Sequence, residues 1–177
     1  MSETSIVTQR FSCRTFTDEP LARGTLEQLL EAARWAPSAG NLQPWRFVVV
    51  TEGRRRRALA AAALGQRFLA DAAAVIVVCA VPEESARLYG DRGRELYCLQ
   101  DTAAAASNLL LAATELGLGG CWVGAFDEAR AARILDLDPG WRPVALLAVG
   151  VPREGPDPRR SRRPLDEVVR WVGEAED

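Results

Sequence analysis

Arg10, Ser12 and Arg14 stand at every second position near the start of the sequence. In an extended backbone alternate side chains share a face, so these three groups would converge. Two guanidinium forks and a hydroxyl are donors well suited to a phosphate monoester. The pattern predicts an anion site, and a solvated charged loop is the alternative interpretation of so short a motif.

The stretch 36–45, with the sequence APSAGNLQPW, is a second candidate for chemistry. Its prolines and glycine prevent it from continuing either the helical pattern before it or the apolar run after it. It carries Ser38, Asn41 and Gln43 as short polar groups, and we expect Trp45 to form an aromatic lid. Its small residues let another molecule approach the backbone closely. An ordinary helix-to-strand connection is the alternative.

Two residue types are absent from all 177 positions: the chain has no histidine, and all 22 of its basic residues are arginine. Histidine-dependent triads and metal sites are therefore excluded, as are a Schiff-base lysine and a P-loop lysine. If the chain is an enzyme, its reactive chemistry is expected to come from a cofactor. Asp101, Cys98 and Cys121 are conceivable proton donors, but we assign them to a buried helix and to core packing.

The composition indicates one globular domain over residues 1–177, since 48% of the residues are apolar. We expect no membrane segment and no signal peptide, because no apolar run is long enough. Four dispersed cysteines without a CxxC pair argue against disulfides and a zinc site and favour the cytoplasm. A net charge of −2 argues against nucleic-acid binding, and the arginines at 54–57 are interpreted as a solvated helix start.

Hydrophobic periodicity predicts strands that alternate with helices. We expect an α+β fold with a small mixed β-sheet flanked by helices. Residues 83–93 are polar and predicted to form a loop, and residues 152–177 form a connector and an amphipathic tail that docks on the core or on a second subunit. Helices are expected at 4–9, 25–36, 54–64, 94–116 and 127–135, and strands at 47–51, 72–80, briefly within 118–126, and at 144–151.

In four ordered pieces the sequence resembles the nitroreductase family of FMN-dependent oxidoreductases. Each piece is weak alone, and their order and spacing along nearly the whole chain carry the resemblance. It implies the nitroreductase fold and an intertwined homodimer with two FMN sites at its interface. The pieces are Arg10-x-Ser12-x-Arg14, the Ala-Pro-Ser-x-x-Asn-x-Gln-Pro-Trp loop, the segment from Leu116-Gly-Leu-Gly to Trp-x-Gly124, and Ser161-Arg162-Arg163-Pro164-Leu165.

The same resemblance implies roles for individual residues. The FMN phosphate would be held by Arg10, Ser12, Arg14, Arg160 and Arg162; the flavin would be reached from the other subunit by Pro37, Ser38 and Asn41; and the isoalloxazine would be bordered by Val123, Gly124, Ala125 and, at its pyrimidine edge, Gln66. Family members often have lysine in the phosphate set, where this chain has arginine. Long members also have a helical excursion over the active site, where this chain is short.

The implied activity is hydride transfer from NADH or NADPH through FMN to nitroaromatics, quinones or similar acceptors, in a ping-pong cycle without a catalytic side chain. Specialised members of the same superfamily are the first alternative: a reductive dehalogenase, an azoline oxidase or a flavin-fragmenting enzyme. A non-catalytic flavin-binding protein is the second. The expected partners are a second copy of the chain and a small-molecule electron acceptor, with neither nucleic acid nor membrane.

Overall fold

The computed structural model describes residues 5–156 and 161–173, which are built around a four-stranded sheet. The order of its strands is β1-β2-β4-β3, and every neighbouring pair is antiparallel. All seven residues of β2 are fully buried, because this central strand is covered on both faces. The strands are β1 (Trp45–Val50), β2 (Ala74–Ala80), β3 (Gly119–Val123) and β4 (Arg142–Gly150).

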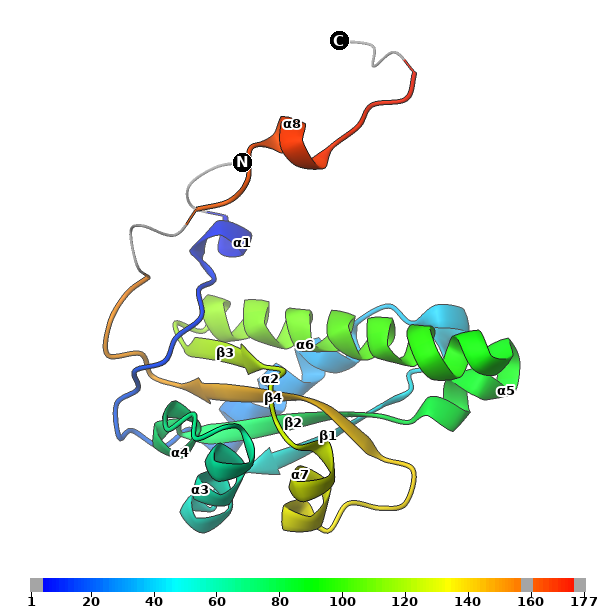
Figure 1. Cartoon of the computed structure of the whole chain (residues 1–177). Coiled ribbons are helices and arrows are strands. Elements are labelled where there is room, and N and C mark those ends of the chain that lie inside the picture. The colour runs from blue at the N-terminus through cyan, green and yellow to red at the C-terminus, as the bar shows by residue number, and fades with distance from the viewer. Residues whose placement is uncertain (1–4, 157–160, 174–177) are drawn as a thin grey trace.

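Helices cover both faces of this sheet (Figure 1). One apolar cluster joins α2 and α6 to one face, and a second joins α3, α4 and α7 to the other. The α-helices are α1 (Ile6–Gln9), α2 (Arg23–Arg34), α3 (Gly53–Ala62), α4 (Phe68–Asp71), α5 (Pro82–Arg92), α6 (Cys98–Glu115), α7 (Glu128–Leu135) and α8 (Leu165–Val168), with a 3-10 turn η1 (Ala39–Asn41) and a π-helical turn η2 (Gly93–Tyr97). No helix in these ranges is long and apolar enough to cross a membrane.

The α+β class is confirmed, and so are most of the expected elements. Asp127 caps α7, since its carboxylate accepts a hydrogen bond from the Arg130 amide at 2.9 Å. Gly117 follows the end of α6 with φ of 72°, the left-handed conformation that glycine adopts freely. The helix predicted from residue 25 begins earlier, at Arg23, because Ala22 rather than Thr25 occupies the N-cap position.

The prediction of a loop over residues 83–93 is wrong, since most of this segment forms α5. Pro82 occupies the first turn, where its missing amide costs no hydrogen bond. Glu83 and Glu84 follow in the same turn and favour a helix start through its dipole. The polar composition reflects exposure of this helix, and Gly90 with φ of 56° interrupts its regular geometry.

The sheet was expected to be mixed, and its four strands are antiparallel. Among the described residues, parallel pairing occurs only as an isolated bridge, which joins Ser12 to Gly120. That bridge adds the extended N-terminal segment to the outer edge of β3. The opposite edge of the sheet is β1.

The C-terminal segment 161–173 extends away from the sheet and its helices (Figure 1). Its apolar side chains are exposed, including Leu165 at 69%, Trp171 at 74% and Val172 at 91%. Exposed apolar side chains that lie close together usually mark a surface that is buried by an interaction partner. We refer to residues 161–173 as the tail.

Candidate functional site

The N-terminal segment runs extended beside β3, as its alternating residues predict. The Cys13 amide donates a hydrogen bond to the Gly120 carbonyl at 3.0 Å, and Cys13 is buried while Ser12 and Arg14 are exposed. Gly119 permits this close approach, because a Cβ there would lie 2.6 Å from the Cys13 sulfur. The alternating exposure expected of an extended backbone is thus confirmed at Ser12, Cys13 and Arg14.

The positive charges of Arg10 and Arg14 both lie close enough to the buried thiol of Cys121 to affect its pKa, so the two arginines lie in the same region of the molecule. The pKa of Cys121 is raised by burial, and the positive charges of Arg14 and Arg10 offset only part of that rise. The Arg14 guanidinium also lies 5.9 Å from the centre of the Phe68 ring at the start of α4. These contacts bring the N-terminal segment, β3 and α4 together at one end of the molecule.

The segment that follows β3 joins the same region through Gln66. The Gln66 side-chain amide donates to the Ala125 carbonyl at 3.3 Å. Gly124 and Ala125 are exposed, whereas Val123 is only 2% exposed and packs in the core. Of the three residues expected beside the isoalloxazine, two therefore present accessible backbone, and Val123 can contribute only through its main chain.

The loop 37–44 holds the second set of predicted residues in an unusual backbone conformation. Gly40, Asn41 and Gln43 have positive φ angles of 57°, 56° and 52°. The Gln43 amide donates to the Ser38 hydroxyl oxygen at 3.0 Å, and the Gln43 side chain donates to the Asn41 side-chain oxygen at 3.3 Å. Pro37 and Asn41 are exposed, so the loop presents a polar surface.

The aromatic lid predicted for Trp45 is wrong. Trp45 is the first residue of β1 and is only 6% exposed, packed with side chains of α2 and α6. An aromatic ring of this size gains more from burial at the start of a strand than from covering a loop.

One protomer does not bring the two sets of site residues together. Figure 1 shows the N-terminal segment beside β3 and α4, whereas loop 37–44 lies toward the opposite end of α6, near α5. Arg162 lies in the tail, where its guanidinium donates to the Ser161 carbonyl at 2.8 Å. Arg160 lies outside the described residues.

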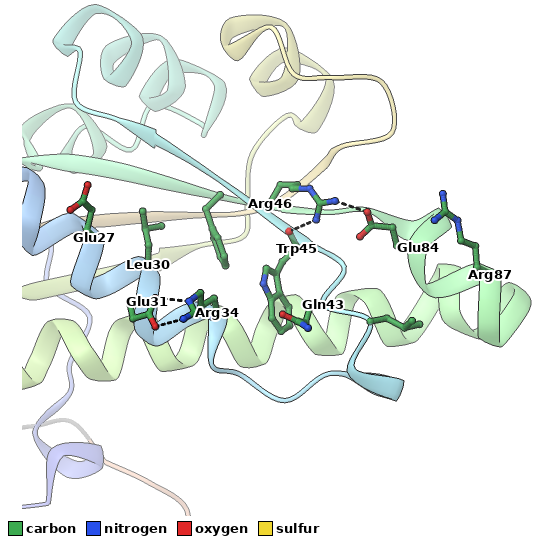
Figure 2. Close-up of a pocket in the computed structure, with 11 residues that line it drawn as sticks. Glu27, Leu30, Glu31, Arg34, Gln43, Trp45, Arg46, Glu84 and Arg87 are labelled. Carbon is green, nitrogen blue, oxygen red and sulfur yellow. Dashed lines mark hydrogen bonds and ion pairs between the residues drawn. The ribbon is translucent and has the colours of Figure 1, made fainter.

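A pocket of about 930 Å³ that the sequence did not reveal opens between α2, the start of β1 and α5 (Figure 2). Its floor is apolar, with Leu30, Trp45 and Phe47, and ion pairs lie at its rim. Arg46 pairs with Glu84 at 2.5 Å and is separated from it by 38 positions, so no local motif marks the pair. A neighbouring pocket extends along β1 to Val49 and shares Leu30. We call the two together the β1 groove.

The family model of the nitroreductase family matches residues 7–67 and 60–151. The chain belongs to the nitroreductase family. This membership identifies an oxidoreductase and confirms the resemblance seen in the sequence.

Individual nitroreductase relatives match over most of the chain. NADH dehydrogenase of Thermus thermophilus is 34% identical over 190 residues, covering 92% of each chain. The 5,6-dimethylbenzimidazole synthase of Rhodospirillum rubrum is 34% identical over 167 residues, covering 82% of this chain and 79% of its own. The crystal structure of nitroreductase A from Vibrio parahaemolyticus superposes with a TM-score of 0.85 at 28% identity, covering 97% and 75% of the two chains. The nitroreductase fold is thereby confirmed.

Proposed function

We propose that this nitroreductase-family chain is an FMN-dependent NAD(P)H oxidoreductase that reduces nitroaromatics, quinones or similar acceptors. Bound FMN would supply the redox chemistry, taking hydride from NADH or NADPH and delivering it to the acceptor in a ping-pong cycle. The names of two relatives support this assignment, since one is an NADH dehydrogenase and the other a nitroreductase. The absence of histidine and lysine from the sequence fits chemistry that resides in the cofactor.

The observation that carries the proposal is the extended N-terminal segment lying along β3. It places Ser12 beside Gly120 at the start of β3, with the charges of Arg10 and Arg14 near the Cys121 thiol. The strand then leads into Gly124 and Ala125, which are exposed. These donors fit an FMN phosphate, because guanidinium groups form charge-assisted and bidentate hydrogen bonds with phosphate oxygens. The accessible backbone fits the edge of a flat ring, which small residues allow to approach closely.

The complete site would require a second copy of the chain. The loop that carries Pro37, Ser38 and Asn41 is bonded to the first turn of α6 through Ala39 and Asp101. These three residues would reach the flavin bound to the partner subunit. The exposed tail would cross to the partner and cover apolar surface in its β1 groove, beside the free edge of the sheet. Arg162 would then approach the phosphate from the tail.

A specialised activity is the second candidate, because one relative that matches most of this chain is named a synthase rather than a reductase. The two candidates share the cofactor and differ in what consumes the reduced flavin. The two candidate activities are therefore distinguished by which substrates the protein turns over and not by whether it binds FMN.

The purified protein tests both candidates. We expect a flavin absorption spectrum and release of FMN on denaturation. NADH or NADPH oxidation should accelerate strongly when a nitroaromatic or a quinone is added, with parallel double-reciprocal plots. Anaerobic bleaching of the flavin by NADPH without turnover of either acceptor would favour the specialised activity. A protein that retains FMN but is not reduced by either nucleotide would contradict both.

A further inference from the structure

Asp101 is a buried carboxylate for which the proposed chemistry has no direct use. It lies in the first turn of α6 and is only 7% exposed. Its Oδ1 atom accepts a hydrogen bond from the Ala39 amide at 3.1 Å, while Oδ2 is buried and has no hydrogen-bond partner among the described residues. Burial raises the pKa of Asp101, and the Ala39 amide offsets this effect only in part. Burying a carboxylate with one oxygen unbonded lowers the stability of the fold, so its presence here calls for an explanation.

The loop that Asp101 contacts is strained. Asn41 and Gln43 both have positive φ angles, a conformation that is unfavourable for most residues with a side chain. Such a conformation persists only where neighbouring structure holds it in place. The hydrogen bond between the Gln43 amide and the Ser38 hydroxyl oxygen lies within the loop. It shapes the loop but cannot fix its position on the rest of the molecule.

Two backbone contacts hold the loop against the body of the protein. The Pro44 carbonyl accepts from the Val81 amide at 2.8 Å, at the end of the loop next to β1. Gly40 packs on α5, where a Cβ would lie 2.8 Å from the Tyr89 hydroxyl oxygen. Among the described residues, Asp101 supplies the side-chain hydrogen bond from the body to this loop, and its bond to Ala39 lies between Ser38 and Asn41.

We propose that Asp101 is a positioning residue that holds loop 37–44 in the conformation presenting Ser38 and Asn41 to the flavin of the partner subunit. It acts through the Ala39 amide and does not itself touch the cofactor. The proposal rests on the proposed FMN function. It adds a requirement that the sequence did not show, namely that FMN affinity depends on a buried carboxylate in a different element from the FMN-contacting residues.

Three variants of the full chain test this role. Asp101→Ala removes the hydrogen-bond acceptor. Asp101→Asn keeps the shape of the side chain and one acceptor oxygen but removes the negative charge. Thr102→Val is the matched control, because Thr102 is the next residue, is also buried, and its hydroxyl donates within α6 to the Cys98 carbonyl at 2.8 Å. Two quantities are measured: the hydrogen-exchange rates of the amides of residues 38–43 in FMN-free protein, and the FMN dissociation constant.

In Asp101→Ala we expect faster exchange at Ala39 and its neighbours and an FMN dissociation constant raised about tenfold or more, because a hydrogen bond to a charged group is lost. Asp101→Asn should have an intermediate affinity, with a melting temperature no lower than that of the wild type. Thr102→Val should leave exchange in the loop and FMN affinity unchanged. A purely structural role would instead lower stability and affinity together in both Asp101 variants.

Unchanged loop exchange in Asp101→Ala would overturn the proposal, whatever the cofactor does. Accelerated exchange with undiminished FMN affinity would overturn it as well, because the loop position would then be irrelevant to binding. If the wild type binds no FMN, the proposed function fails while the exchange data still report on the anchor. The two failures are therefore distinguishable.

Discussion

The side-chain amide of Gln66 donates a hydrogen bond to the carbonyl oxygen of Ala125 at 3.3 Å, across 59 positions of sequence. It connects the turn between α3 and α4 to the exposed segment after β3. Both ends of this bond belong to the predicted flavin-ring set. The contact therefore orders the backbone that we propose faces the flavin ring, independently of the proposed phosphate donors.

Replacing Gln66 with alanine tests this connection. One neutral hydrogen bond contributes about 0.5–1.5 kcal/mol, so we expect FMN affinity to fall about two- to tenfold. Stability should change little, because the bond is solvent-exposed. Titration of the FMN-free protein with FMN measures the effect, and Gln100→Ala, at an exposed glutamine of α6, is the control. Equal affinities of Gln66→Ala and wild type would remove Gln66 from the site.

Arg14→Gln should affect the phosphate end alone. Loss of a charge-assisted bond is worth about 1.5–3 kcal/mol, so FMN should bind roughly tenfold or more weakly. Riboflavin, which lacks the phosphate, should bind equally to the variant and to the wild type. Arg23→Gln is the control, since Arg23 is an exposed arginine that pairs with Glu27 on α2 at 2.8 Å. A parallel loss of riboflavin and FMN affinity in Arg14→Gln would contradict the phosphate assignment.

Gly124→Ala is expected to lower FMN affinity without lowering the stability of the fold. A Cβ at Gly124 would meet only the Trp122 indole nitrogen, at an ordinary 3.9 Å. The FMN-free variant should therefore melt like the wild type, while the added methyl group hinders the flavin and weakens its binding. Calorimetry and FMN titration on the same samples measure the two effects. Gly24→Ala, with open space around its Cβ, should change neither greatly; full FMN affinity in Gly124→Ala would place the ring elsewhere.

Val172→Asp tests whether the tail is buried in a dimer. Val172 is 91% exposed in the protomer, so a charge there costs almost nothing unless a second chain covers it. We expect sedimentation equilibrium to show a dimeric wild type and a weakened dimer in the variant, with reduced FMN retention. Leu64→Asp, at a leucine of the protein body that is 81% exposed, provides the comparison. A wild-type monomer that binds FMN normally would rule out the shared site.

Stability should depend on pH through Asp101 with a definite sign. Because burial raises its pKa above the ordinary value of 3.8, the folded protein binds a proton more readily than the unfolded chain. The contribution of Asp101 to stability is therefore fully present below pH about 4. It is lost as the pH rises through the folded-state pKa. Asp101→Asn removes this dependence, so its melting temperature relative to wild type should rise from pH 4 toward neutrality. The pKa of Cys98 is raised mainly by burial and in smaller part by Asp101, so this thiol titrates at higher pH.

The sequence predicted what depends on local pattern. Alternating exposure at Cys13 and Arg14 follows from extended backbone, and the cap at Asp127 follows from its side-chain chemistry. Trp45 and α5 were mispredicted, because burial of a ring and exposure of a helix depend on neighbours far away in the sequence. Asp101 was correctly assigned to a buried helix. Its contact with Ala39 spans 62 positions and no spacing rule encodes it.

The placement of the two proposed sets of cofactor-binding residues at opposite ends of α6 has a genetic consequence. In the proposed dimer each chain supplies a phosphate end to one site and a loop to the other. A chain damaged at Arg14 and a chain damaged at Asn41 would each be defective by itself, yet a mixed pair would contain one intact site. Damage at the same end of both chains would leave none. Two alleles should therefore complement each other only when they damage different halves of the shared site. Complementation tests would show which residues belong to which half.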